Sequence, residues 1–161
     1  MRQMDVVGVR LELPQTQPVV ILREREGGRY LPIWIGEPEA SAIALAYEGV
    51  VPARPLTHDL LRDVLVALEA MVVEVQITEL RDGVFFADIV LDRGSRISAR
   101  PSDGIALALR TGSPILVADS VLDSAAVEVA EDEQDEVERF REFLDQISPE
   151  DFGPETPRES R

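Results

Sequence analysis

The stretch Arg96-Ile-Ser-Ala-Arg-Pro-Ser-Asp-Gly-Ile-Ala-Leu-Ala-Leu-Arg-Thr-Gly-Ser-Pro-Ile-Leu-Val117 decides the fold. It predicts a strand, a sharp turn, a helix and a second strand. Pro101 ends the first strand, because it fixes φ and lacks an amide hydrogen, and it suits the first turn of a helix. Ser102 and Asp103 offer side-chain acceptors to the free amides of that helix start. Gly112 is typical of the residue that ends a helix.

Polar side chains gather at this strand-to-helix junction. Arg100, Ser102 and Asp103 project from it, next to the free backbone amides of the helix start. Two interpretations remain open at this point. The group is either a helix cap with one ion pair, or part of a functional site.

Length and composition place the chain in a broad class. Its 161 residues, 45% of them apolar, suffice for one domain with a real core. The absence of cysteine excludes a disulfide framework, a thiolate metal site and a cysteine nucleophile. No apolar run reaches the length of a membrane span, and the first residues do not resemble a secretory signal. We therefore expect a cytoplasmic protein with no membrane association.

The charge is strongly negative and unevenly spread. The net charge is −15, and more than half of it lies after residue 125. All 16 basic residues are arginine, whose planar fork suits phosphate and carboxylate, although GC-rich codon usage explains the same fact. Such a balance does not favour nucleic-acid binding by bulk electrostatics.

Hydrophobic periodicity predicts an α+β fold. We expect a mainly antiparallel sheet or half-barrel packed with about three helices, which start near residues 37, 57 and 101. One further helical turn is expected over 119–124. In the second helix Thr57 should be the cap, and the core face should consist of Leu60, Leu61, Val64, Leu65 and Leu68.

The chain divides into three parts. We expect the domain over residues 1–125, an acidic amphipathic helix over 126–147 and a disordered tail over 148–161. The helix carries an apolar stripe of Val137, Phe140, Phe143, Leu144 and Ile147. Because such a stripe needs a partner, it should dock on the domain or on another subunit, and we expect a homo-oligomer.

Two predicted helix starts carry residues suited to chemistry. His58, the only histidine, is a candidate general acid or base, with Asp59 and Arg62 within one turn of it. Glu37 and Glu39 are candidate ligands of a divalent cation such as magnesium, which prefers carboxylate oxygens. The alternatives are a surface histidine and two carboxylates that complement the helix dipole.

Several separated motifs resemble the bifunctional nuclease family, a domain formerly of unknown function. They are Leu31-Pro-Ile-Trp-Ile-Gly36 with Glu39-Ala40, Arg54-Pro-Leu-Thr-His-Asp-Leu60, Phe86-Ala-Asp88, and Ala99-Arg-Pro-Ser-Asp-Gly-Ile-Ala-Leu-Ala-Leu-Arg110. They occur in the family's order over about residues 4–125. Gly104 stands where the family pattern suggests alanine, a departure that costs the helix up to about 1 kcal/mol.

The resemblance implies cleavage of RNA and DNA with low sequence preference, by an intracellular protein that forms oligomers. By residue type, His58 is the expected proton carrier, and Asp59, Asp103 and Glu39 are expected bases or metal ligands. Arg54, Arg62 and Arg100, with Ser102 beside them, are the expected phosphate-binding groups. Arg54, His58, Arg62, Arg100 and Asp103 should share one cleft, because both helix starts follow a proline-marked turn.

A second function fits the same residues. The protein is alternatively a non-catalytic oligomeric module that binds a small anionic ligand or a protein partner through its arginine-rich junctions. The apolar stripe and the negative charge favour the module, whereas the family resemblance favours a nuclease. Convergence of the arginine and carboxylate side chains in one place would support the enzyme.

Overall fold

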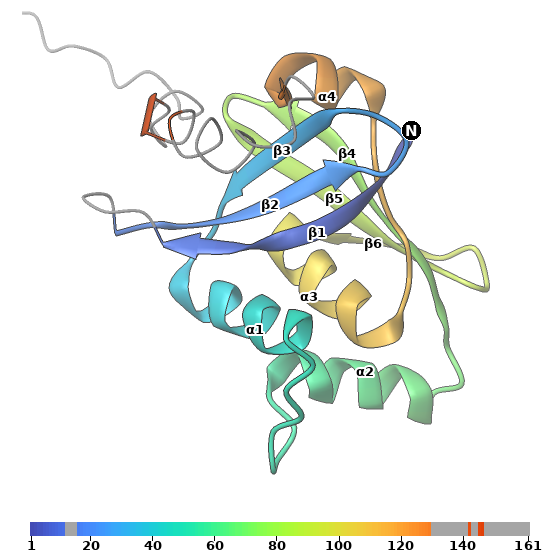
Figure 1. The fold of residues 1–161 in the computed structure, drawn as a ribbon. Coiled ribbons are helices and arrows are strands. Elements are labelled where there is room, and N and C mark those ends of the chain that lie inside the picture. Colours follow the sequence, from blue (N-terminus) through green and yellow to red (C-terminus); the bar gives the residue numbers. More distant parts are fainter. Residues whose placement is uncertain (12–15, 130–141, 143–144, 147–161) are drawn as a thin grey trace, which may run out of the picture.

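The computed structural model describes residues 1–11, 16–129, 142 and 145–146 of the chain. In this part, eight strands form one open sheet in the order β6-β5-β4-β7-β1-β2-β3-β8 (Figure 1). The strands are β1 (Arg2–Leu11), β2 (Pro18–Glu24), β3 (Arg29–Trp34), β4 (Val72–Arg81), β5 (Val84–Leu91), β6 (Arg96–Ala99), β7 (Ile115–Val117) and β8 (Val127–Glu128). The helices are α1 (Glu37–Tyr47), α2 (Thr57–Ala67), α3 (Pro101–Thr111) and α4 (Asp119–Ala125).

The α+β class and the mainly antiparallel sheet are confirmed. Helices begin at residues 37, 57 and 101, as the sequence predicts, and α4 covers the expected turn over 119–124. Among the described strands, the pairing of β4 with β7 is the parallel one. A parallel pair needs a crossover, and β5, β6 and α3 supply it. None of the described helices is long and apolar enough to span a membrane.

The core lies inside the curl of the sheet. In Figure 1, α4 lies above the curled strands and α3 lies below them, with α1 beside α3 and α2 outermost. Leu22, Leu31, Ile77, Leu107 and Leu122 are fully buried there. They come from β2, β3, β4, α3 and α4, so strands and helices from the whole length of the domain share one core.

Helix α2 corrects one prediction. Its expected core face is wrong: Leu60, Leu61, Val64 and Leu68 are exposed, and Leu65 alone of the five packs against the core. The helix is amphipathic, as the periodicity indicates, but it packs on α3 in a layer outside the core. Periodicity shows that a face is apolar and does not show what covers it.

The predicted caps also differ from the structure. Leu56, not Thr57, is the cap of α2, and its amide donates to Asp59 Oδ2 at 3.0 Å. At α3 the cap is Arg100, whose side chain cannot accept a hydrogen bond, and Asp103 bonds to other side chains instead. The cap interpretation of Asp103 is therefore wrong.

The C-terminal part of the chain lies mostly outside the described residues. Val127–Glu128 forms β8 against β3, within the range assigned to the acidic helix. The five residues of the apolar stripe between Val137 and Ile147, and the whole tail over 148–161, fall among the residues that the structure does not describe.

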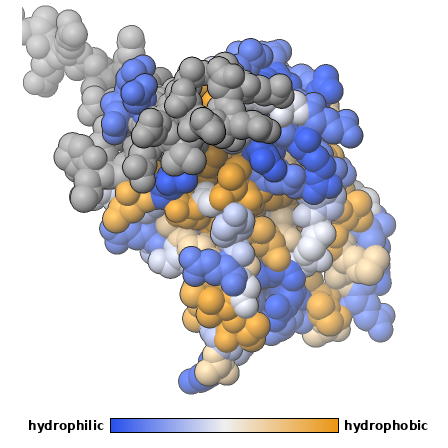
Figure 2. Space-filling view, in the orientation of Figure 1, coloured by the Kyte–Doolittle hydropathy of each residue, from blue (hydrophilic) through white to orange (hydrophobic). Residues whose placement is uncertain are grey.

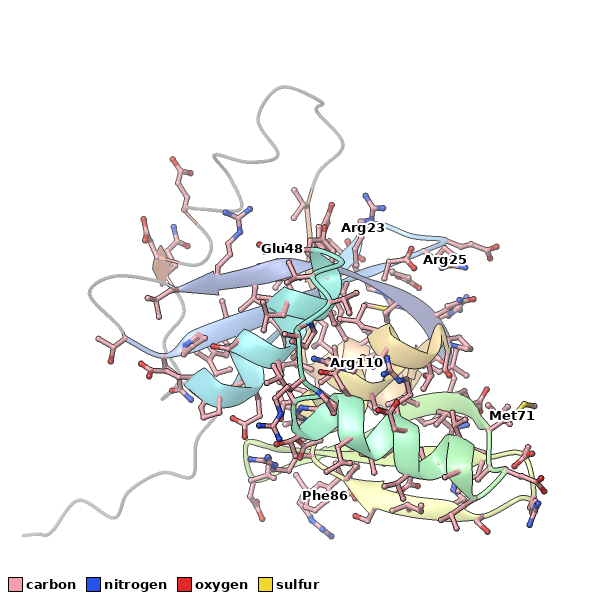
Figure 3. All side chains as sticks on the ribbon, turned by 90° about the horizontal axis from the view of Figure 1, so that it is seen from below. Arg23, Arg25, Glu48, Met71, Phe86 and Arg110 are labelled. Carbon is pink, nitrogen blue, oxygen red and sulfur yellow. The ribbon has the colours of Figure 1, made fainter. Side chains whose placement is uncertain are left out.

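Arg110 joins three helices through its buried side chain. Its Nε donates to Asp59 Oδ1 of α2 at 2.7 Å, and its Nη2 donates to the Ala42 carbonyl of α1 at 3.0 Å. Its Nη1 donates to the Ala106 carbonyl of α3 itself. Both side chains of the ion pair are buried, and Figure 3 shows Arg110 between α3 and α2. Each polar group of this contact has its partner inside the protein.

Gly104 lets α3 approach the sheet. A Cβ at this position would lie 2.7 Å from Val75 Cγ1, and Val75 is fully buried in β4. A real Cβ does not tolerate such a distance. The glycine that departs from the family pattern is therefore explained by the valine opposite it.

We predict that Arg110→Met lowers the free energy of unfolding by about 3–5 kcal/mol, because it leaves the Asp59 carboxylate buried without its cation. Urea unfolding measures this. The matched control is Arg96→Met, which breaks a solvent-exposed pair with Asp88 and should cost no more than about 1 kcal/mol. Equal costs for the two variants would contradict the structural role of Arg110.

We predict that Gly104→Ala destabilises the protein although alanine is the better helix former. The clash with Val75 should cost about 1–3 kcal/mol, more than the gain in helix propensity. The double variant Gly104→Ala/Val75→Ala should cost less than the two single changes together, by about 1 kcal/mol or more. A more stable single variant in thermal unfolding would show that the close contact does not matter.

Candidate functional site

The three larger helices begin in the same way. Each carries a carboxylate at its third residue: Glu39 in α1, Asp59 in α2 and Asp103 in α3. Carboxylates are favourable there because the helix dipole is positive at its start. Arginines of the stretch over 96–117 bind all three, since Arg100 pairs with Glu39 and Asp103, and Arg110 pairs with Asp59. The stretch thereby ties the three helix starts together.

Asp103 is the centre of the polar cluster. Arg100 donates to it twice, from Nε to Oδ2 at 2.8 Å and from Nη2 to Oδ1 at 3.1 Å. His58 Nε2 lies 2.9 Å from Asp103 Oδ1, across 45 positions of the sequence. Arg100 Nη2 also donates to Glu39 Oε1 at 2.9 Å. We name these four residues, His58, Asp103, Arg100 and Glu39, the junction cluster.

Two members of the junction cluster, Asp103 and Arg100, stabilise each other's charged forms. Burial of Asp103 opposes its ionisation, but the hydrogen bonds from Arg100 and His58 outweigh it and lower the pKa of the carboxyl. The hydrogen bonds to Asp103 and Glu39 raise the pKa of the Arg100 guanidinium. A carboxylate that stays ionised can hold the histidine ring in one orientation and stabilise its protonated form.

The side chain of His58 is 12% exposed, and its second nitrogen is not fully buried. Among the described residues no buried side-chain nitrogen or oxygen lacks a hydrogen-bond partner. His58 Nδ1 has no partner in the same part of the chain, so it is not sealed inside the protein. With Nε2–H donated to Asp103, Nδ1 carries the lone pair that accepts a proton.

Arg100 faces solvent beside this histidine. Its side chain is 65% exposed, and its bonds to described residues use Nε and Nη2. The Nη1 donors thus remain available to an anion. A guanidinium fork next to a proton acceptor is an arrangement that suits a phosphate ester.

The other candidate residues lie apart from the junction cluster. The side chain of Asp59 is occupied by Leu56 and Arg110, whose bonds outweigh burial and lower its pKa. Arg62 pairs with Asp63 and lines a separate pocket of about 280 Å³. Arg54 is exposed in the connector before α2, and Ser102 is buried in the first turn of α3.

The expected magnesium ligands do not assemble. In the described ranges, no three His, Asp or Glu side chains lie close enough to hold a metal ion. Glu37 is exposed, while Glu39 and Asp103 both bind Arg100, whose guanidinium occupies the space between them. The carboxylates present therefore do not fit the oxygen-rich cage of a divalent cation.

Sequence reasoning assigned no role to Arg110. It stands in the last turn of a helix of small apolar residues, where burying a guanidinium is costly unless it finds hydrogen-bond partners. Its distance of 51 positions from Asp59 hides the pairing from local patterns. The signal in the sequence that points to Arg110 is the presence of an arginine in a helix whose other residues are mostly buried.

Two comparisons with known proteins give matches to this chain. A model of the bifunctional nuclease domain matches residues 20–130. Two uncharacterized proteins of Mycobacterium tuberculosis, from strains CDC 1551 / Oshkosh and ATCC 25618 / H37Rv, are each 52% identical to the chain. Each match covers 94% of this chain and 98% of the relative. The match includes α1, α2 and α3 and with them the whole junction cluster, and the chain belongs to the bifunctional nuclease domain family.

Proposed function

We propose that this protein hydrolyses phosphodiester bonds of RNA and DNA at the junction cluster. The observation that carries the proposal is the 2.9 Å contact of His58 Nε2 with Asp103, beside an exposed Arg100. It combines an oriented proton acceptor with a cation suited to phosphate. Membership of the family supports a nuclease-like role.

The proposed reaction uses water as the nucleophile. His58 Nδ1 takes a proton from the water as its oxygen forms a bond to phosphorus. Asp103 stabilises the imidazolium that results. Arg100 stabilises the charge that develops on the non-bridging oxygens. The bond from phosphorus to the leaving oxygen then breaks, and that oxygen takes up a proton from the imidazolium or from solvent.

A site of this kind would cleave with low sequence preference. Arg100 contacts the phosphate, which every nucleotide shares, and contacts to phosphate carry no base information. With a net charge of −15 the whole chain repels nucleic acid, so binding rests on this local cation. We further propose a cytoplasmic location and a homo-oligomeric state.

The alternative is a non-catalytic module that binds a small anionic ligand or a protein partner. The observation that favours it is the neutralisation of Arg100 by two carboxylates, Glu39 and Asp103, in the structure. A phosphate must compete with Glu39 for the guanidinium. Under this alternative, substitutions in the junction cluster change the affinity for the ligand, and the wild-type protein itself shows no cleavage.

We predict that His58→Gln and Asp103→Asn lower the cleavage rate of labelled single-stranded RNA and duplex DNA by about 100-fold or more, because each removes the oriented proton acceptor. The matched control is Asp88→Asn. Asp88 and Asp103 are both 28% exposed and both pair with an arginine, so the control should keep the wild-type rate.

All variants must be purified identically, because a contaminating nuclease gives the same rate in every sample. Equal rates in wild type and His58→Gln would refute the assignment. Parallel assays with a chelator report whether a divalent cation takes part. If no sample cleaves but wild type binds an oligonucleotide more tightly than Arg100→Gln does, the binding module replaces the enzyme.

A further inference from the structure

Helix α2 presents an apolar face to solvent. Leu60 is 54% exposed, Val64 45% and Leu68 66%. Their spacing of four residues places them in one line along the helix. This line points away from α3, the element on which α2 packs. For a soluble protein, a continuous apolar line of this kind marks a contact surface.

The exposed apolar surface extends beyond the helix. Leu56 and Leu61 adjoin the line, and Val50, Val51 and Met71 are exposed in the segments that flank α2. Figure 2 shows hydrophobic side chains at the lower end of the molecule, where Figure 1 places α2 and the connector before it.

The pattern on α2 is the one by which helices pack on helices. Thr57, Leu60, Leu61, Val64, Ala67 and Leu68 follow each other at steps of three and four residues. All six are exposed, and none is charged. We name these six residues the α2 seam. A seam of this spacing receives the side chains of a second helix between its own.

We propose that the α2 seam binds the α2 seam of a second copy of this chain, with the two helices antiparallel across a twofold axis. A second copy carries the same apolar seam, so each seam can pack against the other. Isologous contacts of this kind form closed dimers. This inference rests on the homo-oligomeric part of the proposed function and not on its chemistry.

Charge selects this partner over nucleic acid or a membrane surface. The charged side chains of α2 are already paired, Arg62 with Asp63 and Asp59 with Arg110. An anionic partner would therefore find no free cation on this helix, and the chain as a whole carries −15. Two uncharged seams meet without bringing like charges together.

The apolar area is adequate for a dimer. Eight exposed side chains, those of the seam's leucines and valine with the four apolar neighbours named above, present on the order of 400 Å² in each copy. A stable interface buries about 800 Å² in each partner, a little over half of it apolar. The polar remainder is available from the rim of the helix.

The proposed interface adjoins the junction cluster. Thr57 of the seam directly precedes His58, and Leu61 lies one turn further along α2. A rise of about 1.5 Å for each residue puts Leu61 only about 5 Å along the helix axis from His58. A partner helix on the seam would therefore lie close to the start of α2, which carries His58.

We predict that light scattering at micromolar concentration gives wild type a mass of twice 17.8 kDa. Val64→Glu/Leu68→Glu should give a single chain mass, because four carboxylates would meet in the dimer. Val84→Glu is the matched control and should remain dimeric. Val84 is 51% exposed but begins β5, where it pairs with Arg81 at the end of β4 opposite to the end that follows α2.

A monomeric wild type overturns the proposal, and so does a dimer that persists in Val64→Glu/Leu68→Glu with an unchanged circular dichroism spectrum. A second measurement does not depend on the folding of that variant. The chain has no cysteine, so under a mild oxidant Leu61→Cys should form a covalent dimer and Val84→Cys should not. Failure of Leu61→Cys to cross-link would place the interface elsewhere. Neither measurement depends on nuclease activity.

Discussion

The buried contact of Arg110 with Asp59 and the Ala42 carbonyl is the interaction on which the helical layer depends. A buried ion pair contributes little net stability, since desolvation offsets attraction, but removing one partner is expensive. Here the guanidinium also satisfies a carbonyl of α1 and one of α3. The contact therefore specifies one arrangement of three helices more than it adds to the total stability.

The polar site inherits its geometry from that arrangement. His58 directly precedes Asp59 in the first turn of α2. The bond from Arg110 to Asp59 therefore also fixes the backbone position from which the His58 side chain extends. Arg100 and Arg110 stand at opposite ends of α3. One tethers the start of α1, and the other tethers both α1 and the start of α2. A single helix with an arginine at each end thereby builds the scaffold and supplies part of the site.

Local signals in the sequence are sufficient for much of this. Proline and glycine punctuation locates the three helix starts, and the pairing of His58 with Asp103 follows the expectation that two such starts converge. The same reasoning does not distinguish Asp59 from Asp103, because both are third residues of helices. The two carboxylates differ in the arginine that binds each. Asp59 is bound by Arg110, 51 positions away, and Asp103 is bound by Arg100, three positions away.

Periodicity also has a definite limit in α2. Leu60, Val64 and Leu68 have the spacing of a core face, yet the layer they would cover is already complete with α1 and α3. An apolar face predicts a partner and does not say whether that partner is in the same chain. Gly104 shows the opposite case, in which an apparent weakness of a helix is explained by one valine on a distant strand.

The short strand β7 has a consequence for the order of folding. The strands on its two sides form two sets of neighbouring hairpins, β1 to β3 and β4 to β6. Each set pairs residues that are close in sequence. Each of the three residues of β7 pairs on both sides, as Val117 does with Arg2 and with Ile77. Local pairs form before distant ones because they lose less chain entropy. The two halves of the sheet can therefore assemble independently. Within the sheet, the two halves join through the three residues of β7, which close a loop that spans nearly the whole domain.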